Sequence, residues 1–130
     1  MADHTDPALV RTWMTGPPQY DMPGCDIDLR EGGAYRFVWE WEEDRKLQRM
    51  AACGTFRDID PERRLFYTEA LDMWPHNETL VDQTFRAEGN RTHVTMLLTY
   101  PSMEVRNAAL ASPMEEGLEA SCASLDRLLP

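Results

Sequence analysis

The chain has 130 residues, 42% of them hydrophobic, four tryptophans and a formal net charge of −10. This composition excludes a disordered or fibrous protein. The acidity argues against nucleic acid or anionic lipid heads as partners, because both require clustered Lys and Arg. No stretch approaches the roughly 20 apolar residues of a membrane span, so we expect no membrane partner.

Length and cysteine usage predict one domain, residues 1–130, in a reducing compartment. The three cysteines, Cys25, Cys53 and Cys122, are far apart and odd in number. They form neither a disulfide framework nor a C-x-x-C pair, which favours a cytoplasmic protein. The N-terminus lacks the basic-then-apolar pattern of a secretion signal, which favours the same location.

Along the chain, Gly16-Pro17-Pro18 would end any helix begun at residues 9–13, and strand-like segments follow. Most of these segments alternate apolar and polar side chains and are bounded by Gly, Pro, Asn or Asp. Short breaks between long strands indicate an antiparallel meander. The predicted strands cover residues 25–29, 34–42, 48–59, 63–73, 79–87 and 92–100.

The second predicted strand carries an aromatic residue at every second position. Because side chains alternate between the two faces of a strand, Tyr35, Phe37 and Trp39 should form one row. Trp41 lies where the strand meets a charged turn, and we expect it near the mouth of a cavity.

After Pro101 the apolar period changes from two to nearly four, which indicates helix. We predict a short helix at about 103–111 and a main one at about 113–129, since Pro113 suits a first turn. The sheet should curve around the main helix, giving an α+β fold in which the aromatic row faces the helix. The apolar stripe of the helical region comprises Leu110, Met114, Leu118, Cys122, Leu125 and Leu129.

Three segments resemble the SRPBCC (START-like) superfamily, and within it the AHSA-like family of proteins similar to activators of a heat-shock-chaperone ATPase. They are "MPGCDIDLREGGAYRFVWEW", "GTFRDIDPERRLFYTEAL" and "YPSMEVRNAALASPMEEGLEASCASLDRLL". The resemblance covers about residues 9–129. It implies a helix-grip fold: a curved antiparallel sheet of about six strands around a long C-terminal helix, enclosing a hydrophobic cavity.

The resemblance also contains one departure, since family members usually carry an extra strand and helix before the segment equivalent to residues 11–13. Either the protein is a shortened member of the family or its start codon was placed late. A missing strand would leave backbone hydrogen-bonding groups unpaired at the sheet edge, and a second copy could cover them. We treat a homodimer as a hypothesis.

Metal and nucleophile patterns are absent from the sequence. His4, His76 and His93 lack metal-ligand spacing, so we expect neither a metal nor another cofactor. No G-x-S-x-G motif occurs. We expect the cysteines to be small apolar side chains that fill space in the core. No catalytic residue is therefore assigned.

Two polar features allow alternative interpretations. Gln83 falls between Val81 and Phe85 on the predicted inner face, where its amide either bonds a neighbour or a trapped water, or anchors a ligand. A solvated rim is the expected place for the acidic residues Asp58, Asp60, Glu62 and Glu69, since nothing fixes two of them within reach of each other.

Aromatic and methionine side chains suggest a pocket lining, although a plain core has the same pattern in a sequence. The first functional hypothesis is non-catalytic binding of a small hydrophobic or amphipathic ligand between the sheet and the C-terminal helix. A chaperone-associated interaction protein, implied by the resemblance, is the second, and a cavity enzyme of cyclase or hydrolase type is the third. The candidate ligand-binding residues are Tyr35, Phe37, Trp39, Phe56, Tyr67, Gln83, Phe85, Met96, Met114 and Leu118.

Overall fold

The structure is a computed structural model that describes residues 2–14, 20–72, 74–112 and 114–128. Side chains are described for the same residues apart from 2, 3, 12, 114–117 and 128. None of the described helices combines the length and the apolarity needed to cross a lipid bilayer.

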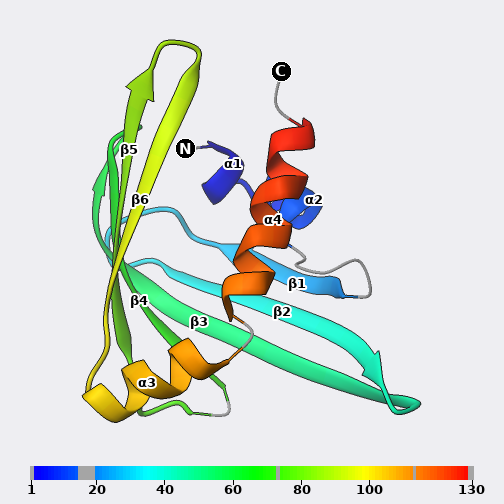
Figure 1. Cartoon of the computed structure of the whole chain (residues 1–130). Helices are drawn as coiled ribbons and strands as arrows, with labels where there is room; N and C mark the ends of the chain where they lie inside the picture. Colours follow the sequence, from blue (N-terminus) through cyan, green and yellow to red (C-terminus); the bar gives the residue numbers. More distant parts are fainter. Residues whose placement is uncertain (1, 15–19, 73, 113, 129–130) are drawn as a thin grey trace.

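Within the described ranges, six antiparallel strands form the sheet, and each pairs with the next strand along the chain (Figure 1). The meander predicted from the short breaks is therefore confirmed. The β5–β6 hairpin stands steeply against the direction of β1, β2 and β3, which gives the sheet its curvature. The strands are β1 (Asp21–Ile27), β2 (Ala34–Glu43), β3 (Lys46–Asp60), β4 (Arg64–Leu71), β5 (Thr79–Glu88) and β6 (Arg91–Thr99).

In the part of the chain that the structure describes, four helices accompany the sheet: α1 (Ala2–Thr5), α2 (Pro7–Trp13), α3 (Met103–Ala111) and α4 (Met114–Leu128). The bounds of α3 and α4 agree with the predicted C-terminal helices. Asp6 caps α2 by accepting a hydrogen bond from the N–H of Ala8 at 3.0 Å, and Pro7 occupies the first turn. The Asp-Pro pair is the sequence signal for this helix start, which the prediction for residues 9–13 did not use.

The inner face of the sheet is defined by cross-strand pairs, whose side chains point to the same side. Phe56 of β3 pairs with Tyr67 of β4, Tyr67 with Val81 of β5, and Val81 with Leu98 of β6. Phe56 and Val81 are buried, and Tyr67 and Leu98 are half-buried. This face therefore carries the apolar side chains of the sheet.

Strand β3 passes very close to β4 at Gly54. A Cβ atom at this position would lie 1.7 Å from the carbonyl oxygen of Thr68 and 2.9 Å from Cε1 of Tyr35. Only glycine fits here. The ring of Tyr35 therefore lies over Gly54, and its hydroxyl donates a hydrogen bond of 2.7 Å to the carbonyl oxygen of Thr68.

The aromatic row of β2 lies on the inner face, as predicted, but its described partner is α2 rather than the C-terminal helix. Phe37 and Trp39 pack against a buried cluster in which Val10 of α2 is completely covered. The indole N–H of Trp39 donates a 2.8 Å hydrogen bond to the carbonyl oxygen of Met14, just after α2. A buried indole N–H needs such a partner, and the end of α2 supplies it.

The predicted burial of the helical apolar stripe is wrong for three of its members. Leu125 is half-buried, and the side chain of Met114 and the whole of Leu129 lie outside the described residues. Leu110 of α3 is 60% exposed, Leu118 of α4 is 45% exposed, and Cys122 is also exposed. Ser121 is buried instead, at 5% exposure. The physical reason is that α4 lies against α2 and α3 rather than directly on the strands, so the sheet does not cover its stripe.

The end of β1 differs slightly from the prediction. The strand ends at Ile27 rather than at Leu29, because the chain turns there: the N–H of Arg30 donates a hydrogen bond of 2.9 Å to the carbonyl oxygen of Asp28. Trp41 stacks on Tyr20, with ring centroids 4.8 Å apart and planes 6° from parallel.

Candidate functional site

The predicted binding residues separate into three groups by burial. Tyr35, Phe56, Gln83 and Phe85 are buried, between 4% and 8% exposed. Phe37, Trp39 and Tyr67 are half-buried, whereas Met96 and Leu118 are 39% and 45% exposed. The side chain of Met114 lies outside the described residues. The inner face therefore consists of a packed part and an open part.

The packed part is an aromatic cluster. The ring of Tyr35 lies 5.5 Å from those of both Phe56 and Tyr67, and Phe56 lies 6.0 Å from Tyr67. These centroid distances are those of tilted and edge-to-face aromatic packing. The three rings fill the centre of the sheet and form its core.

Gln83 is the polar group at the edge of this cluster. The hydroxyl of Tyr67 donates a hydrogen bond of 3.3 Å to Oε1 of Gln83. The amide oxygen thus bonds a neighbour, one of the two alternatives that the sequence left open. Within the described residues, the amide NH₂ of Gln83 makes no hydrogen bond. It remains available as a donor beside Met96, the residue paired with Gln83 on β6.

The open part follows the inner side of β6. Val94 and Met96 are 38% and 39% exposed, although their partners on β5, Phe85 and Gln83, are both buried. On one face of α4, Ser121 is buried but Leu118, one turn earlier, is 45% exposed. The inner side of β6 and part of α4 thus carry exposed apolar side chains. We call this region, defined by Val94, Met96 and Leu98, the β6 trough.

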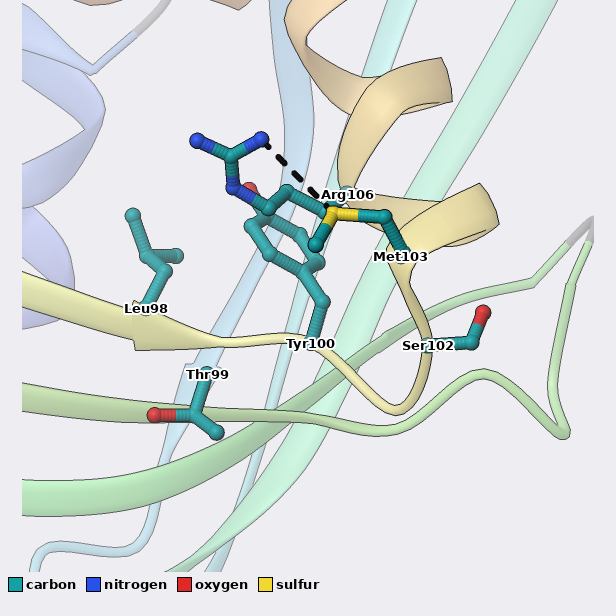
Figure 2. Close-up of a pocket in the computed structure, with 6 residues that line it drawn as sticks. All are labelled: Leu98, Thr99, Tyr100, Ser102, Met103 and Arg106. Atoms are coloured by element: carbon teal, nitrogen blue, oxygen red, sulfur yellow. Dashed lines mark hydrogen bonds between the residues drawn. The ribbon is translucent and has the colours of Figure 1, made fainter.

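A pocket of about 310 Å³ continues the β6 trough at the corner between β6 and α3 (Figure 2). Figure 2 shows the ring of Tyr100 beside the stem of Arg106. The guanidinium Nη1 of Arg106 lies 3.9 Å from Sδ of Met103 and 3.4 Å from Oδ1 of Asn107. Apart from the turn at Pro101, nothing in the sequence indicates this pocket. Its lining residues are Leu98, Thr99, Tyr100, Ser102, Met103 and Arg106.

The prediction that Glu69 lies on a solvated rim is wrong. It lies on β4 two residues after Tyr67 and opposite Thr79, which puts it on the inner face and not on a solvated rim. Burial raises the pKa of the Glu69 carboxyl. Its two-residue spacing from the inward-facing Tyr67 was the signal that could have located it.

The negative charge of Glu69 affects the pKa values of three tyrosines. The pKa values of Tyr35, Tyr67 and Tyr100 are all raised, first by burial and then by the negative charge of Glu69. The three rings come from β2, from β4 and from the segment after β6. Glu69 therefore lies among phenol rings contributed by distant parts of the chain.

The other acidic residues behave as the sequence predicted, on the outer face or at turns. Arg64 donates from Nε and Nη2 to the two carboxylate oxygens of Asp82 at 2.8 and 2.9 Å, and from Nη1 to Asp58 at 3.0 Å. The hydrogen bonds from Arg64 hold the pKa of Asp82 below its usual value. These groups are partly exposed and point away from the β6 trough.

The side chains that could bind a metal or act as a nucleophile do not lie together among the described residues. No cluster of three or more His, Cys, Asp or Glu side chains suited to a metal occurs among the described residues. Cys25 is buried, and burial raises the pKa of its thiol, as suits an apolar filler. The filler prediction is wrong for Cys122, because α4 exposes it.

The antiparallel six-stranded sheet with its C-terminal helices defines the class of the protein, an α+β helix-grip domain. The family model for "Activator of Hsp90 ATPase homolog 1-like protein" matches residues 4–130. The chain belongs to this family, within the SRPBCC superfamily. A search of curated proteins finds no match.

Solved structures with the same fold come from several bacteria. A Rhodobacter sphaeroides protein is 28% identical, with a TM-score of 0.86 over 98% of this chain and 80% of its own. A Mycobacterium smegmatis protein is 21% identical, with a TM-score of 0.83 over 99% of this chain and 80% of its own. An AHSA1-like protein from Aeromonas hydrophila is 17% identical, with a TM-score of 0.69 over 98% of this chain and 82% of its own.

Proposed function

We propose that the protein binds a small hydrophobic or amphipathic ligand in the β6 trough, between the sheet and α4. The observation that carries this proposal is the exposure of Val94 and Met96, at 38% and 39%, directly beside the buried Phe85 and Gln83. Single exposed apolar side chains are ordinary, but here they are consecutive inward positions of one strand facing the interior of the fold.

Continuity with the pocket supports the same proposal. Leu98 follows Val94 and Met96 on the inner side of β6 and also lines the 310 Å³ pocket. That volume is at the lower end of the range for small-molecule sites. The trough and pocket together offer an apolar strip with a few polar groups, among them the Gln83 amide and the Tyr100 hydroxyl. Sites for small amphipathic molecules have this composition.

A thermal-melting panel of fatty alcohols, fatty acids and aromatic polyketides tests the proposal. We expect at least one class to raise the melting temperature in a concentration-dependent way, because a ligand that binds only the folded state stabilises it. A panel in which no member shifts the melting temperature of the folded protein contradicts the proposal.

Neighbouring residues of β6 supply a matched pair of variants. Met96 points into the trough, whereas Leu97 points outward and is 64% exposed. We expect Met96→Glu to weaken ligand binding by about tenfold or more, equivalent to roughly 1.4 kcal/mol, and Leu97→Glu to leave the affinity unchanged. Equal losses in the two variants would place binding outside the trough.

The family description favours a second candidate function, stimulation of a chaperone ATPase. Three exposed apolar side chains, those of Leu97, Met103 and Leu110, are 60% to 66% exposed and could contact a protein partner. An ATPase assay with the chaperone of the source organism tests this candidate. Stimulation that Leu97→Glu reduces and Met96→Glu preserves would support it, and unchanged ATPase turnover would remove it.

A further inference from the structure

The carboxyl of Glu69 is an acidic group on an otherwise apolar and phenolic surface. Among the described residues no Lys, Arg or His forms an ion pair with it, and it makes no hydrogen bond there. An ionised carboxylate in such a place is unfavourable unless a cation or hydrogen-bond donor accompanies it. In the part of the chain that the structure describes, the Glu69 carboxyl therefore has neither a cation nor a hydrogen-bond donor beside it.

The register of the sheet shows what surrounds this group. Cys53 pairs with Ala70, so the next residue, Gly54, lies opposite Glu69. Because Gly54 has no side chain, the ring of Tyr35 lies over it and ends at the carbonyl of Thr68, the residue before Glu69. One side of Glu69 is thus bounded by a phenol ring.

The other side of Glu69 leads to the pocket. Thr79 of β5 is paired with Glu69, and the pairing of Leu80 with Thr99 places Tyr100 beside Thr79. Two strand spacings separate Glu69 from Tyr100, about 10 Å. Tyr100 lines the pocket in Figure 2. A ligand that enters the pocket therefore has Glu69 within the reach of a small molecule.

Arg106 does not satisfy Glu69. Its guanidinium contacts Met103 and Asn107 on α3, and among the described residues it forms no ion pair with Glu69. The pocket therefore contains the positive charge of Arg106, whereas the region around Glu69 contains a carboxyl group among aromatic rings. A carboxylate flanked by tyrosine rings is suited to an ammonium group, which is attracted both by the charge and by the ring faces.

We propose that Glu69 is the polar anchor of the site and that the ligand it selects is an amphipathic amine, with its apolar body along the β6 trough and its protonated nitrogen at Glu69. This inference rests on the proposed binding function and specifies the chemistry of the ligand head group. Tyr35 and Tyr67 border the nitrogen, and Leu98 and Met96 contact the apolar body.

The test compares three probes that differ only in the head group: decylamine, decanol and decanoate, each below its micelle concentration. Calorimetric titration of the wild-type protein should show decylamine binding roughly tenfold or more tightly than decanol, because one charge-assisted hydrogen bond is gained. Decanoate should bind most weakly, since its carboxylate would approach Glu69. In Glu69→Gln the preference for the amine over the alcohol should disappear while decanol binding persists.

A control separates this site from general attraction between a cation and an acidic protein. Glu119→Gln on α4 removes the same charge from an exposed position. It should retain the wild-type preference for decylamine. Equal loss of the preference in both variants would overturn the inference, as would equal binding of all three probes to the wild type.

The outcomes also distinguish this inference from the function on which it rests. Binding of decanol that Met96→Glu weakens, without any preference for the amine, would overturn the anchor at Glu69 and leave the binding function supported. Failure of every probe to bind would contradict both.

Discussion

The hydroxyl of Tyr35 donates a 2.7 Å hydrogen bond to the carbonyl oxygen of Thr68, 33 residues later in the chain. This bond connects β2 to β4 across β3 at Gly54, where the missing side chain leaves room for the ring. It also fixes the position of Tyr35 beside Glu69, the residue after Thr68. The hydrogen bond between Tyr35 and Thr68 therefore belongs to the packed core and also positions a ring beside the candidate site.

Tyr35→Phe should lower the free energy of unfolding by about 1–3 kcal/mol, because the Thr68 carbonyl loses a buried partner. Urea denaturation followed by circular dichroism measures this change. Tyr20→Phe is the matched control, since Tyr20 is half-buried and its ring stacks on Trp41. Similar stability of the two variants would show that the hydroxyl of Tyr35 contributes nothing.

Gly54→Ala should be strongly destabilising, by about 3 kcal/mol or more, because the added methyl would overlap the backbone of Thr68. Thermal unfolding provides the measurement. Gly89→Asn provides the control: it adds a side chain where nothing lies within 4 Å, and asparagine tolerates its φ of +63°. A Gly54→Ala variant as stable as Gly89→Asn would contradict the close approach of β3 and β4.

Trp39→Phe should detach the end of α2 from the sheet, since phenylalanine cannot donate to the carbonyl oxygen of Met14. The expected loss of stability is about 1–3 kcal/mol, and amide hydrogen exchange should increase in α2. Trp74→Phe serves as the control because Trp74 is 52% exposed. Unchanged exchange in α2 would show that the indole does not hold this helix.

Glu69 should give the protein an unusual pH dependence. Its folded pKa is raised above the ordinary 4.5, so between these two values the folded state binds more protons than the unfolded state. Stability should therefore fall as pH rises from about 4.5 through the raised value, and remain lower above it. In Glu69→Gln this decrease should be absent, and the variant should be at least as stable as the wild type at neutral pH.

Urea denaturation across this pH range measures the effect, and Asp82→Asn supplies a control of opposite sign. Arg64 holds the pKa of Asp82 low, so the stability that Asp82 contributes is present above about pH 3.8 and disappears as pH falls through the lowered value. Parallel pH profiles for the wild type and Glu69→Gln would contradict the placement of Glu69 on the inner face.

Much of the fold could be predicted from the chain alone, because period-two alternation and Gly and Pro breaks act locally. The strand bounds agree with the pattern to within a few residues, and the period change after Pro101 located both C-terminal helices. The packing of α4 could not be predicted in this way. Its stripe has the correct helical spacing, but whether Leu118 is covered depends on α2, whose position is set by the distant contact between Trp39 and Met14.

The site was predicted less well, for a physical reason of the same kind. Aromatic residues such as Phe56 and Tyr67 look identical in a sequence whether they fill a core or line a cavity, and most of those chosen here belong to the core. Glu69 was assigned to the solvated rim because acidic side chains usually lie in water. Its inward direction follows from alternation with Tyr67, and strand register confirms it by placing Glu69 level with Thr79 and Gly54.

Ligand contacts to Met96 test the central claim most directly. Methionine methyl groups labelled with ¹³C can be observed by NMR while unlabelled decylamine or decanol is added. We predict intermolecular NOEs from the alkyl chain to the methyl group of Met96 in the trough, and none to Met22, which is 4% exposed beneath α2. A bound alkyl chain without NOEs to Met96, or the absence of any bound chain, would contradict the claim that the β6 trough is the binding site.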